Sequence, residues 1–165
     1  LIVDFGGGVK SDDDLRIAFE SGAQMVTGGS IAVKNPELFS SWLAKYGSER
    51  IILGADVKNR MIAVSGWMES SNCELFPFLG EYIAKGINKV ICTDIDCDGM
   101  LSGPNLEQLV KLNEAVSCNI TASGGIKDLS NIIDLKNANM YGAICGRSIY
   151  SGTLNLVDAI KEATR

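Results

Sequence analysis

The sequence contains no histidine, only three prolines, and no long apolar run. Without histidine, Ser–His and Cys–His nucleophile pairs and most zinc sites are excluded, so acid–base chemistry must use carboxylates, lysine, tyrosine or cysteine. A membrane-spanning helix needs roughly 20 consecutive apolar residues, and no segment approaches that length. Lys and Arg form no cluster and the net charge is −5, so we expect neither a nucleic-acid nor a membrane partner.

No C-x-x-C pair occurs among the cysteines, and their number is odd. Several lie in apolar runs such as "KVICT" and "GAICG". These features predict reduced, buried thiols in a cytoplasmic protein, and together with the lack of histidine they indicate no metal site. The five cysteines are Cys73, Cys92, Cys97, Cys118 and Cys145.

What the sequence does contain is an alternation of short apolar strands with amphipathic helices. The chain has 165 residues, 46% of them hydrophobic, which suits one domain with a substantial core. Six strand–helix units can be read along it, and this alternation predicts right-handed crossovers and a parallel sheet. The expected strands are "LIVDF", "AQMVTG", "RIILGADV", "KVICTDI", "CNITASGG" and "YGAICG". Six units could form an open doubly wound α/β sheet or three quarters of a (β/α)8 TIM barrel, which typically needs about 250 residues.

An internal repeat favours the barrel. "FGGGVKS" at 5–11 resembles "ASGGIKD" at 122–128, and "TGGSIA" at 27–32 resembles "CGRSIY" at 145–150, at offsets of 117 and 118 residues. Such a match, in which 1–46 resembles 118–164, is typical of a duplicated half-barrel. We therefore expect residues 1–165 to form a single partial barrel, units three to eight of eight. The abrupt start in an apolar strand at Leu1 gives the same count, with two N-terminal units absent.

The repeated motifs are glycine-rich and lie where a strand ends and a helix begins. Glycine lets the backbone approach a ligand closely, and free N–H groups of a first helical turn bind anions. We expect two phosphate half-sites on opposite sides of the barrel mouth, which suits a small substrate phosphorylated at both ends; the alternative is that these are only tight turns. The expected phosphate-binding residues are Gly7, Gly8, Lys10, Gly29 and Ser30 in the first, and Gly124, Gly125, Gly146 and Arg147 in the second.

The stretch "TDIDCDGM" resembles the start of a calcium loop, but the rest of that motif is missing. An EF-hand loop follows a helix and ends with a bidentate acid at its twelfth position; here a strand precedes it and the twelfth residue is Asn105. If the strand continues, Asp94, Asp96 and Asp98 share one face and Thr93 points to the other, into the barrel mouth. We interpret Asp94 and Asp96 as structural, and Asp98 before Gly99 as a turn and helix-entry cap.

Asp56 is the stronger candidate for catalysis. It ends the apolar strand "RIILGADV", at the carboxyl end where barrel active sites are built. A partly desolvated carboxylate there could act as a general acid. The alternative is an exposed aspartate in a turn.

Taken together, "GGGVKS", "TGGSIAVKNP", "GADVKN", "AVSGW", "TDIDCDGMLSGPN", "ASGGIKD" and "GAICGRSIYSG" resemble the isomerase family of histidine biosynthesis that acts on ProFAR. The resemblance covers the chain, which we expect to be the C-terminal three quarters of such an enzyme. It implies a cofactor-free Amadori rearrangement of the aminoaldose ProFAR to the aminoketose PRFAR by two aspartates. Asp56 matches the acid that opens the ribose ring, Thr93 matches a threonine near the reacting sugar, and the second aspartate has no counterpart here.

Three further residues are expected to contact the substrate: Trp67, Asp98 and Ser123. For Trp67 the alternative is a packed loop aromatic. Lys10 stands where arginine is commoner in the family, which keeps the charge but loses bidentate phosphate binding.

Alternative functions remain open at this point. The related cyclase subunit of imidazole glycerol phosphate synthase shares the "TDIDCDGMLSGPN" block, although "SGW" favours the isomerase. A non-catalytic phosphate-binding barrel fragment and a bifunctional isomerase that also accepts phosphoribosylanthranilate are possible too. We expect the complete enzyme to be monomeric, and this chain alone to be inactive and prone to self-association through open sheet edges.

Overall fold

The structure, a computed structural model, describes residues 1–164. Six parallel strands form its main sheet in the order β1-β2-β3-β6-β7-β8. The parallel α/β sheet predicted from the strand–helix alternation is confirmed. The six strands are β1 (Asp4–Gly6), β2 (Met25–Gly28), β3 (Ile51–Lys58), β6 (Lys89–Asp94), β7 (Asn119–Ser123) and β8 (Gly142–Ile144).

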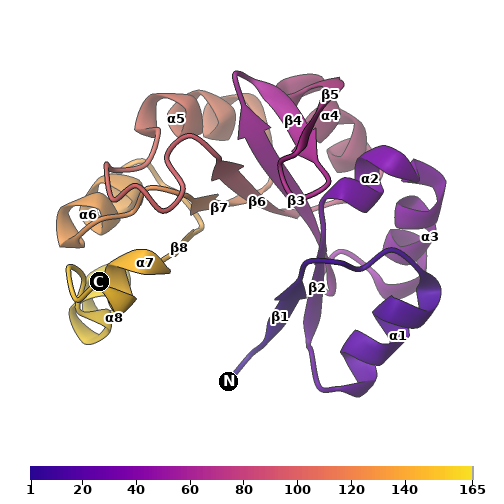
Figure 1. The fold of residues 1–165 in the computed structure, drawn as a ribbon, viewed down its shortest axis with the longest axis horizontal. Coiled ribbons are helices and arrows are strands. Elements are labelled where there is room, and N and C mark those ends of the chain that lie inside the picture. The colour runs from indigo at the N-terminus through magenta and orange to yellow at the C-terminus, as the bar shows by residue number, and fades with distance from the viewer. Residues whose placement is uncertain (165) are drawn as a thin grey trace.

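Helices cover one side of this sheet, and the strands curve around the other side as an open arc (Figure 1). Most of the larger helices begin where the sequence provides capping side chains, such as Asn35 before Pro36 in α3 and Asp128 before α6. The helices that follow the strands are α1 (Asp12–Glu20), α3 (Pro36–Tyr46), α4 (Leu75–Ala84), α5 (Leu106–Ala115), α6 (Leu129–Asn137) and α8 (Leu156–Ala163).

Four elements were not predicted. Two are short helices, α2 (Ser30–Lys34) and α7 (Arg147–Tyr150), which follow the glycine-rich ends of β2 and β8. The other two are the antiparallel strands β4 (Met61–Val64) and β5 (Glu69–Glu74), which extend β3 as a hairpin. A five-residue helix is too short for a clear hydrophobic period, which is why pattern analysis missed the helices.

Side chains on the main strands alternate between two faces. Leu53, Ala55 and Val57 of β3 are buried among core residues against the helices. The alternate residues of β3, including Gly54 and Asp56, therefore point to the inner side of the arc. This alternation places Asp56 on the face opposite the hydrophobic core.

The prediction for "TDIDCDGM" needs a correction. Strand β6 ends at Asp94, and residues 95–99 form a turn. Asp96 and Asp98 therefore do not continue a strand face with Asp94. Asp98 does not cap the next helix either: Asn105 does, by accepting a hydrogen bond from the backbone N–H of Gln108 at 3.3 Å.

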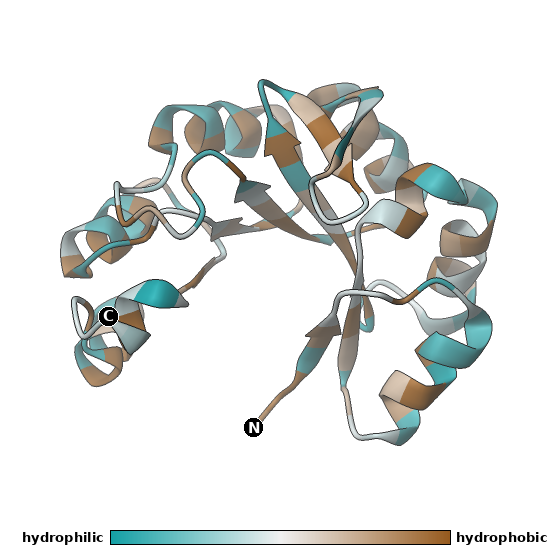
Figure 2. Cartoon of the chain, viewed as in Figure 1, coloured by the Kyte–Doolittle hydropathy of each residue, from teal (hydrophilic) through white to brown (hydrophobic). Residues whose placement is uncertain are grey.

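The two edges of the sheet are apolar and exposed. The segment before β1 is hydrophobic (Figure 2), and Leu1, Ile2 and Phe5 are largely open to solvent. At the other edge, Ile144 of β8 and Val157 of α8 are exposed as well. β1 and β8 are the two ends of the strand order and do not pair with each other.

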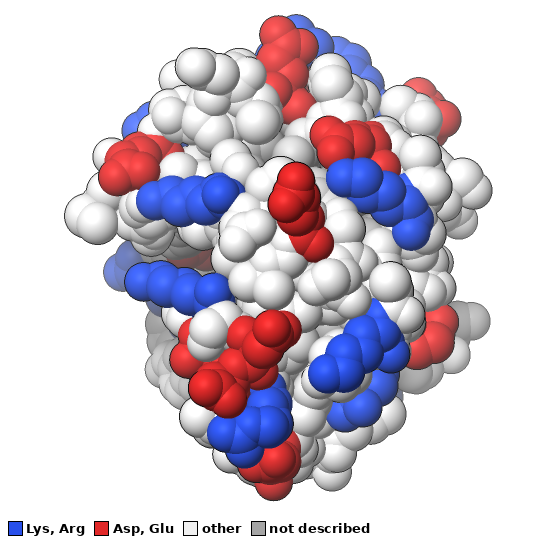
Figure 3. Space-filling view, turned by 90° about the vertical axis from the view of Figure 1, so that its right-hand side faces the viewer, with Lys and Arg blue, Asp and Glu red and all other residues white. Residues whose placement is uncertain are grey.

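The outer face over the first helices carries charges of both signs in close alternation (Figure 3). Basic side chains there lie beside acidic ones, as Arg16 does between Asp13 and Glu20 on α1. This face has no extended basic surface. Within residues 1–164, no helix has the length and apolar character needed to cross a membrane.

Candidate active site

Three predicted site residues lie in one row across the sheet. Asp56 of β3 pairs in register with Thr93 of β6, and Thr93 pairs with Ser123 of β7. Partners in a parallel sheet point to the same face, so the three side chains share the inner face at the carboxyl ends of their strands. Thr93 is buried, although it is polar. The expectation that Thr93 points into the mouth agrees with this register.

Trp67 contacts the carboxylate of Asp56 directly. Its indole Nε1 donates a hydrogen bond to Asp56 Oδ2 at 2.9 Å, and its ring is 45% exposed. Trp67 lies in the turn between β4 and β5, residues 65–68, which we call the Trp67 turn. An exposed aromatic bound to a strand-end carboxylate is not a packed core residue, so its position suits contact with a ligand at Asp56.

The Trp67 turn is tied to helix α2. The backbone N–H of Ser65 donates to Ser30 Oγ at 3.0 Å, and Lys34 Nζ donates to Ser65 Oγ at 2.5 Å. Lys34 also pairs with Glu69 at 3.3 Å. Sequence analysis missed Lys34, Ser65 and Glu69. The one sequence signal for this turn was the Ser-Gly dipeptide before Trp67, a pair typical of turns.

A second group of predicted residues lines one pocket of about 200 Å³. This pocket lies beyond the carboxyl ends of β7 and β8 and is bounded by the β6–α5 loop. Its predicted lining residues are Asp98, Ser123, Gly124, Gly125, Gly146 and Arg147. Arg147 Nη1 donates a hydrogen bond to the carbonyl oxygen of Gly99, which ties α7 to that loop. The pocket thus combines a glycine-rich turn, a guanidinium group and a carboxylate.

The two glycine-rich motifs have closely matching backbones. Gly7 and Gly8 have φ of 104° and 77°, and Gly124 and Gly125 have φ of 96° and 81°. These left-handed values favour glycine. The residues that precede α2 and α7, Gly29 and Gly146, share φ of −104°.

The first motif nevertheless differs from the second in its surroundings. Gly7 and Gly8 line a cavity of about 410 Å³ between the β1 edge and α1, whose other walls include Val3, Phe5 and Ile17. The hydroxyl of Ser30 faces the Trp67 turn. The structure therefore gathers the second predicted half-site into one pocket but does not gather the first in the same way.

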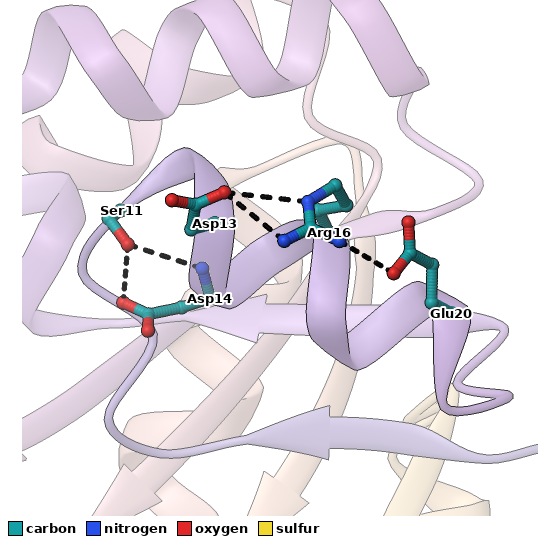
Figure 4. Close-up of polar contacts among 5 residues, drawn as sticks. All are labelled: Ser11, Asp13, Asp14, Arg16 and Glu20. Atoms are coloured by element: carbon teal, nitrogen blue, oxygen red, sulfur yellow. Dashed lines mark hydrogen bonds and ion pairs between the residues drawn. The ribbon is translucent and has the colours of Figure 1, made fainter.

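The loop after Gly8 is held by the start of α1 (Figure 4). Ser11 Oγ donates to Asp14 Oδ2 at 2.8 Å and accepts from the Asp14 backbone N–H at 3.2 Å. Asp14 also accepts from the backbone N–H of Lys10 at 2.9 Å. The hydrogen bond from Lys10 lowers the pKa of Asp14, with a further contribution from Ser11. This capping arrangement fixes the Lys10 backbone and leaves its side chain exposed.

Asp94 has a structural role, as interpreted from the sequence. Its Oδ1 accepts from the backbone N–H groups of Asp96 and Cys97 at 3.0 and 3.3 Å, and its Oδ2 accepts from Asn105 Nδ2 at 2.9 Å. These bonds shape the β6–α5 loop that carries Asp98. Asp96 pairs with Lys58 at 3.3 Å. Within residues 1–164, no group of three or more Cys, Asp or Glu side chains is placed to hold a metal ion.

All five cysteines are free thiols, but only Cys92 is fully buried. The prediction of burial was wrong for the other four, which are partly exposed because they lie at strand ends, in loops and on the sheet edge. Burial raises the pKa of Cys92 to about 12. Burial also raises the pKa of Cys97, beside Asp94, and both thiols are therefore poor nucleophiles at neutral pH.

Comparisons with known proteins identify a family and similar sequences. The family described as "Histidine biosynthesis protein" matches residues 1–155. A 1-(5-phosphoribosyl)-5-((5-phosphoribosylamino)methylideneamino)imidazole-4-carboxamide isomerase from Bacteroides thetaiotaomicron is 61% identical over 159 residues, 96% of this chain. An isomerase of the same name from Bacteroides fragilis is 58% identical over 157 residues, 94% of this chain. A third, from Parabacteroides distasonis, is 54% identical over 162 residues, 98% of this chain and 68% of that protein.

The chain spans 66% of the length of each of the two Bacteroides relatives. The expectation of three quarters was therefore wrong. It equated a count of strand–helix units with a fraction of residues, although such units differ in length. The match over residues 1–155 and these identities place the chain in the family of histidine biosynthesis proteins.

Proposed function

We propose that this chain is the larger part of an isomerase that converts the aminoaldose ProFAR into the aminoketose PRFAR by an Amadori rearrangement. The proposal rests on one observation: Asp56, Thr93 and Ser123 lie in register at the carboxyl ends of three neighbouring strands. Relatives more than half identical to this chain bear the name of that isomerase. Their names favour isomerisation over the cyclase reaction.

The complete protein, in this proposal, is a (β/α)8 barrel of which this chain supplies units three to eight. The six-stranded parallel order and the unpaired edges β1 and β8 support it. The matching backbones of the two glycine-rich motifs support a half-barrel repeat, with residues 1–46 corresponding to 118–164. Two further units between β8 and β1 would cover both apolar edges.

Asp56 is the proposed general acid. Its side chain is half-buried on the inner face, and one carboxylate oxygen accepts a hydrogen bond from the exposed indole of Trp67. When the substrate arrives, Trp67 would release this oxygen. Asp56, in its protonated carboxylic acid form, would then donate its proton to the ribose ring oxygen as the C1–O bond breaks, and would be left as a carboxylate. Ring opening leaves a cationic imine, and a base must remove the C2 proton to complete the rearrangement. That base is the second aspartate, outside this chain.

The two phosphates of the substrate are the proposed ligands of the glycine-rich motifs. The pocket lined by Gly124, Gly125 and Arg147 supports this role, since backbone N–H groups and a guanidinium both bind anions. The other proposed phosphate site is the first half-site, formed by Gly7, Gly8, Lys10, Gly29 and Ser30. Asp98 and Ser123 lie at the same pocket, where they would contact the nearby sugar.

The test uses this chain completed with the N-terminal third of the Bacteroides thetaiotaomicron isomerase. The fusion should isomerise ProFAR, and Asp56→Asn should lower kcat by about 10²- to 10⁴-fold with KM little changed, the usual effect of losing a general acid. Asp96→Asn is the matched control. It removes an exposed carboxylate from the turn after β6, which pairs with Lys58 of β3.

Other results would point elsewhere. A fusion that forms imidazole product with ammonia, but does not isomerise ProFAR, would identify a cyclase. Binding of ProFAR that Asp56→Asn leaves intact, without turnover in either protein, would identify a phosphate-binding fragment. Turnover by the 165-residue chain alone at the rate of the fusion would show that the missing base is wrongly assigned.

We further propose that the complete enzyme works as a cofactor-free monomer in the cytoplasm. Five free thiols suit a reducing compartment. Turnover of phosphoribosylanthranilate by the same fusion would show the broader, bifunctional specificity.

A further inference from the structure

The Trp67 turn has a backbone that needs outside support. Ser65, Gly66 and Trp67 have φ of 58°, 64° and 70°, three consecutive left-handed residues of which two are not glycine. Such conformations are disfavoured and persist only where surrounding contacts fix them. The contacts that fix this turn therefore decide where the Trp67 indole lies.

Those contacts converge on Ser65. Its backbone N–H donates to Ser30 Oγ, and its hydroxyl accepts from Lys34 Nζ at 2.5 Å and donates to Glu69 Oε2 at 3.1 Å. Lys34 also reaches Glu69 at 3.3 Å, so one ammonium group joins both ends of the turn. Hydrogen bonding from Lys34, with help from Ser65, lowers the pKa of Glu69 and keeps it charged.

Helix α2 gives Lys34 a fixed base. Tyr82 of α4 donates a buried hydrogen bond to the carbonyl oxygen of Ala32 at 2.6 Å, and Ala32 is itself 2% exposed. Asn35, which follows Lys34, caps α3. The ammonium of Lys34 therefore acts from a helix bound to the core, whereas the turn that it contacts is exposed.

We propose that Lys34 is a positioning residue that latches the Trp67 turn, through Ser65 and Glu69, in the conformation where Trp67 covers Asp56. This rests on the proposed function, in which the substrate must displace Trp67 from the acid. The latch sets how often the acid is uncovered in the resting protein. Lys34 does not touch the reacting atoms.

The indole N–H of Trp67 gives a direct readout. It exchanges with water only when its bond to Asp56 opens, so its exchange rate reports the open population. The other tryptophan is an internal reference: Trp42 is 1% exposed and its Nε1 donates to Asp12 Oδ1 at 2.7 Å. In protein labelled with ¹⁵N-tryptophan, two indole signals are expected, and Trp67→Phe assigns them.

Lys34→Met should raise the exchange rate of the Trp67 indole by about two- to fivefold, the range expected for loss of one partly exposed ion-pair contact. The Trp42 rate should not change. Removing the positive charge makes the surroundings more negative, which lowers the local hydroxide concentration and slows base-catalysed exchange. A higher exchange rate in Lys34→Met therefore cannot come from the change in charge. Lys34→Arg should stay near the wild-type rate because it keeps a cation within reach.

Lys111→Met is the matched control, because Lys111 forms an exposed ion pair with Glu107 at 2.5 Å on distant α5. The proposal is overturned if Lys34→Met leaves the Trp67 rate unchanged, or if Lys111→Met raises it equally. Ser65→Ala provides an independent variant on the turn side that changes no charge and removes the hydroxyl between Lys34 and Glu69; it should also raise the rate. The measurement uses no substrate, so it can fail without affecting the isomerase proposal, and loss of isomerase activity would not alter its result.

Discussion

At the scale of single residues, Asp56 and Asp94 show how surroundings give two strand-end carboxylates different roles. Asp94 accepts hydrogen bonds from two backbone N–H groups and from the side chain of Asn105. Both of its carboxylate oxygens are therefore used to shape a loop. Asp56 accepts one hydrogen bond from an indole on an exposed turn. A carboxylate with one displaceable donor can exchange protons with a substrate, whereas one held by three fixed donors stabilises structure.

Tyr82 anchors helix α2 beside the site, because its hydroxyl donates a hydrogen bond to the carbonyl oxygen of Ala32. Tyr82→Phe should cost about 1–2 kcal/mol of unfolding free energy at pH 7, because the buried Ala32 carbonyl loses its donor. Urea unfolding measures this. Tyr141→Phe, at an exposed position, is the control and should cost little.

The same residue predicts a pH dependence. Burial raises the pKa of Tyr82 from 10.0 to about 12. Because the folded-state pKa is the higher one, the neutral phenol's contribution is complete below pH 10 and is lost as pH rises toward 12. Between pH 7 and pH 11, the free energy of unfolding should therefore fall less for Tyr82→Phe than for the wild type. An equal fall in both proteins would contradict the assignment.

At the scale of elements, the β6–α5 loop and the end of β7 approach each other unusually closely. A Cβ at Gly124 would lie 2.6 Å from the carbonyl oxygen of Asp94. Gly7 occupies the corresponding position of the first motif with similar positive φ, but a Cβ there meets nothing within 4 Å. The two glycines share a backbone requirement and differ in packing.

This pair separates conformation from steric contact. Gly7→Ala should cost about 1 kcal/mol, the usual penalty of a left-handed alanine. Gly124→Ala should cost about 3 kcal/mol or more, because the backbone must also move away from Asp94. Chemical denaturation of both variants tests this. Equal losses would mean that the close approach relaxes freely.

At the scale of the whole molecule, the apolar edges dominate behaviour. Phe5 at the β1 edge and Val157 at the β8 end are 46% and 58% exposed. Exposed strand edges with apolar neighbours favour association between chains. The chain by itself therefore has surfaces that a complete barrel would cover.

We expect concentration-dependent self-association of the 165-residue chain in sedimentation velocity experiments. Combined Phe5→Glu and Val157→Glu should weaken it by at least about tenfold, because each buried apolar side chain contributes roughly 1.5–3 kcal/mol. Met68→Glu is the control, at an exposed position in the β4–β5 turn that extends the central strand β3. A monomer at all concentrations would show that the edges do not pair.

Local patterns in the sequence predict most of the element types and select several candidate site residues. The alternation of short apolar strands with amphipathic helices can be read directly along the chain, so it predicted the parallel sheet and most of the helices. Strand-end position and motif resemblance selected Asp56 and Thr93. Neighbouring strands then align these two in register.

The contacts between side chains of separate elements could not be predicted from the sequence. The bonds from Trp67 to Asp56 and from Lys34 to Ser65 join residues 11 and 31 positions apart, and no sequence period links them. The end of β6 at Asp94 is a local effect instead, which the strand interpretation missed: that carboxylate binds the backbone N–H groups two and three residues later and turns the chain. Local propensity acts within a few residues, whereas the bonds of Trp67 and Lys34 depend on how β3, α2 and the β4–β5 hairpin pack together.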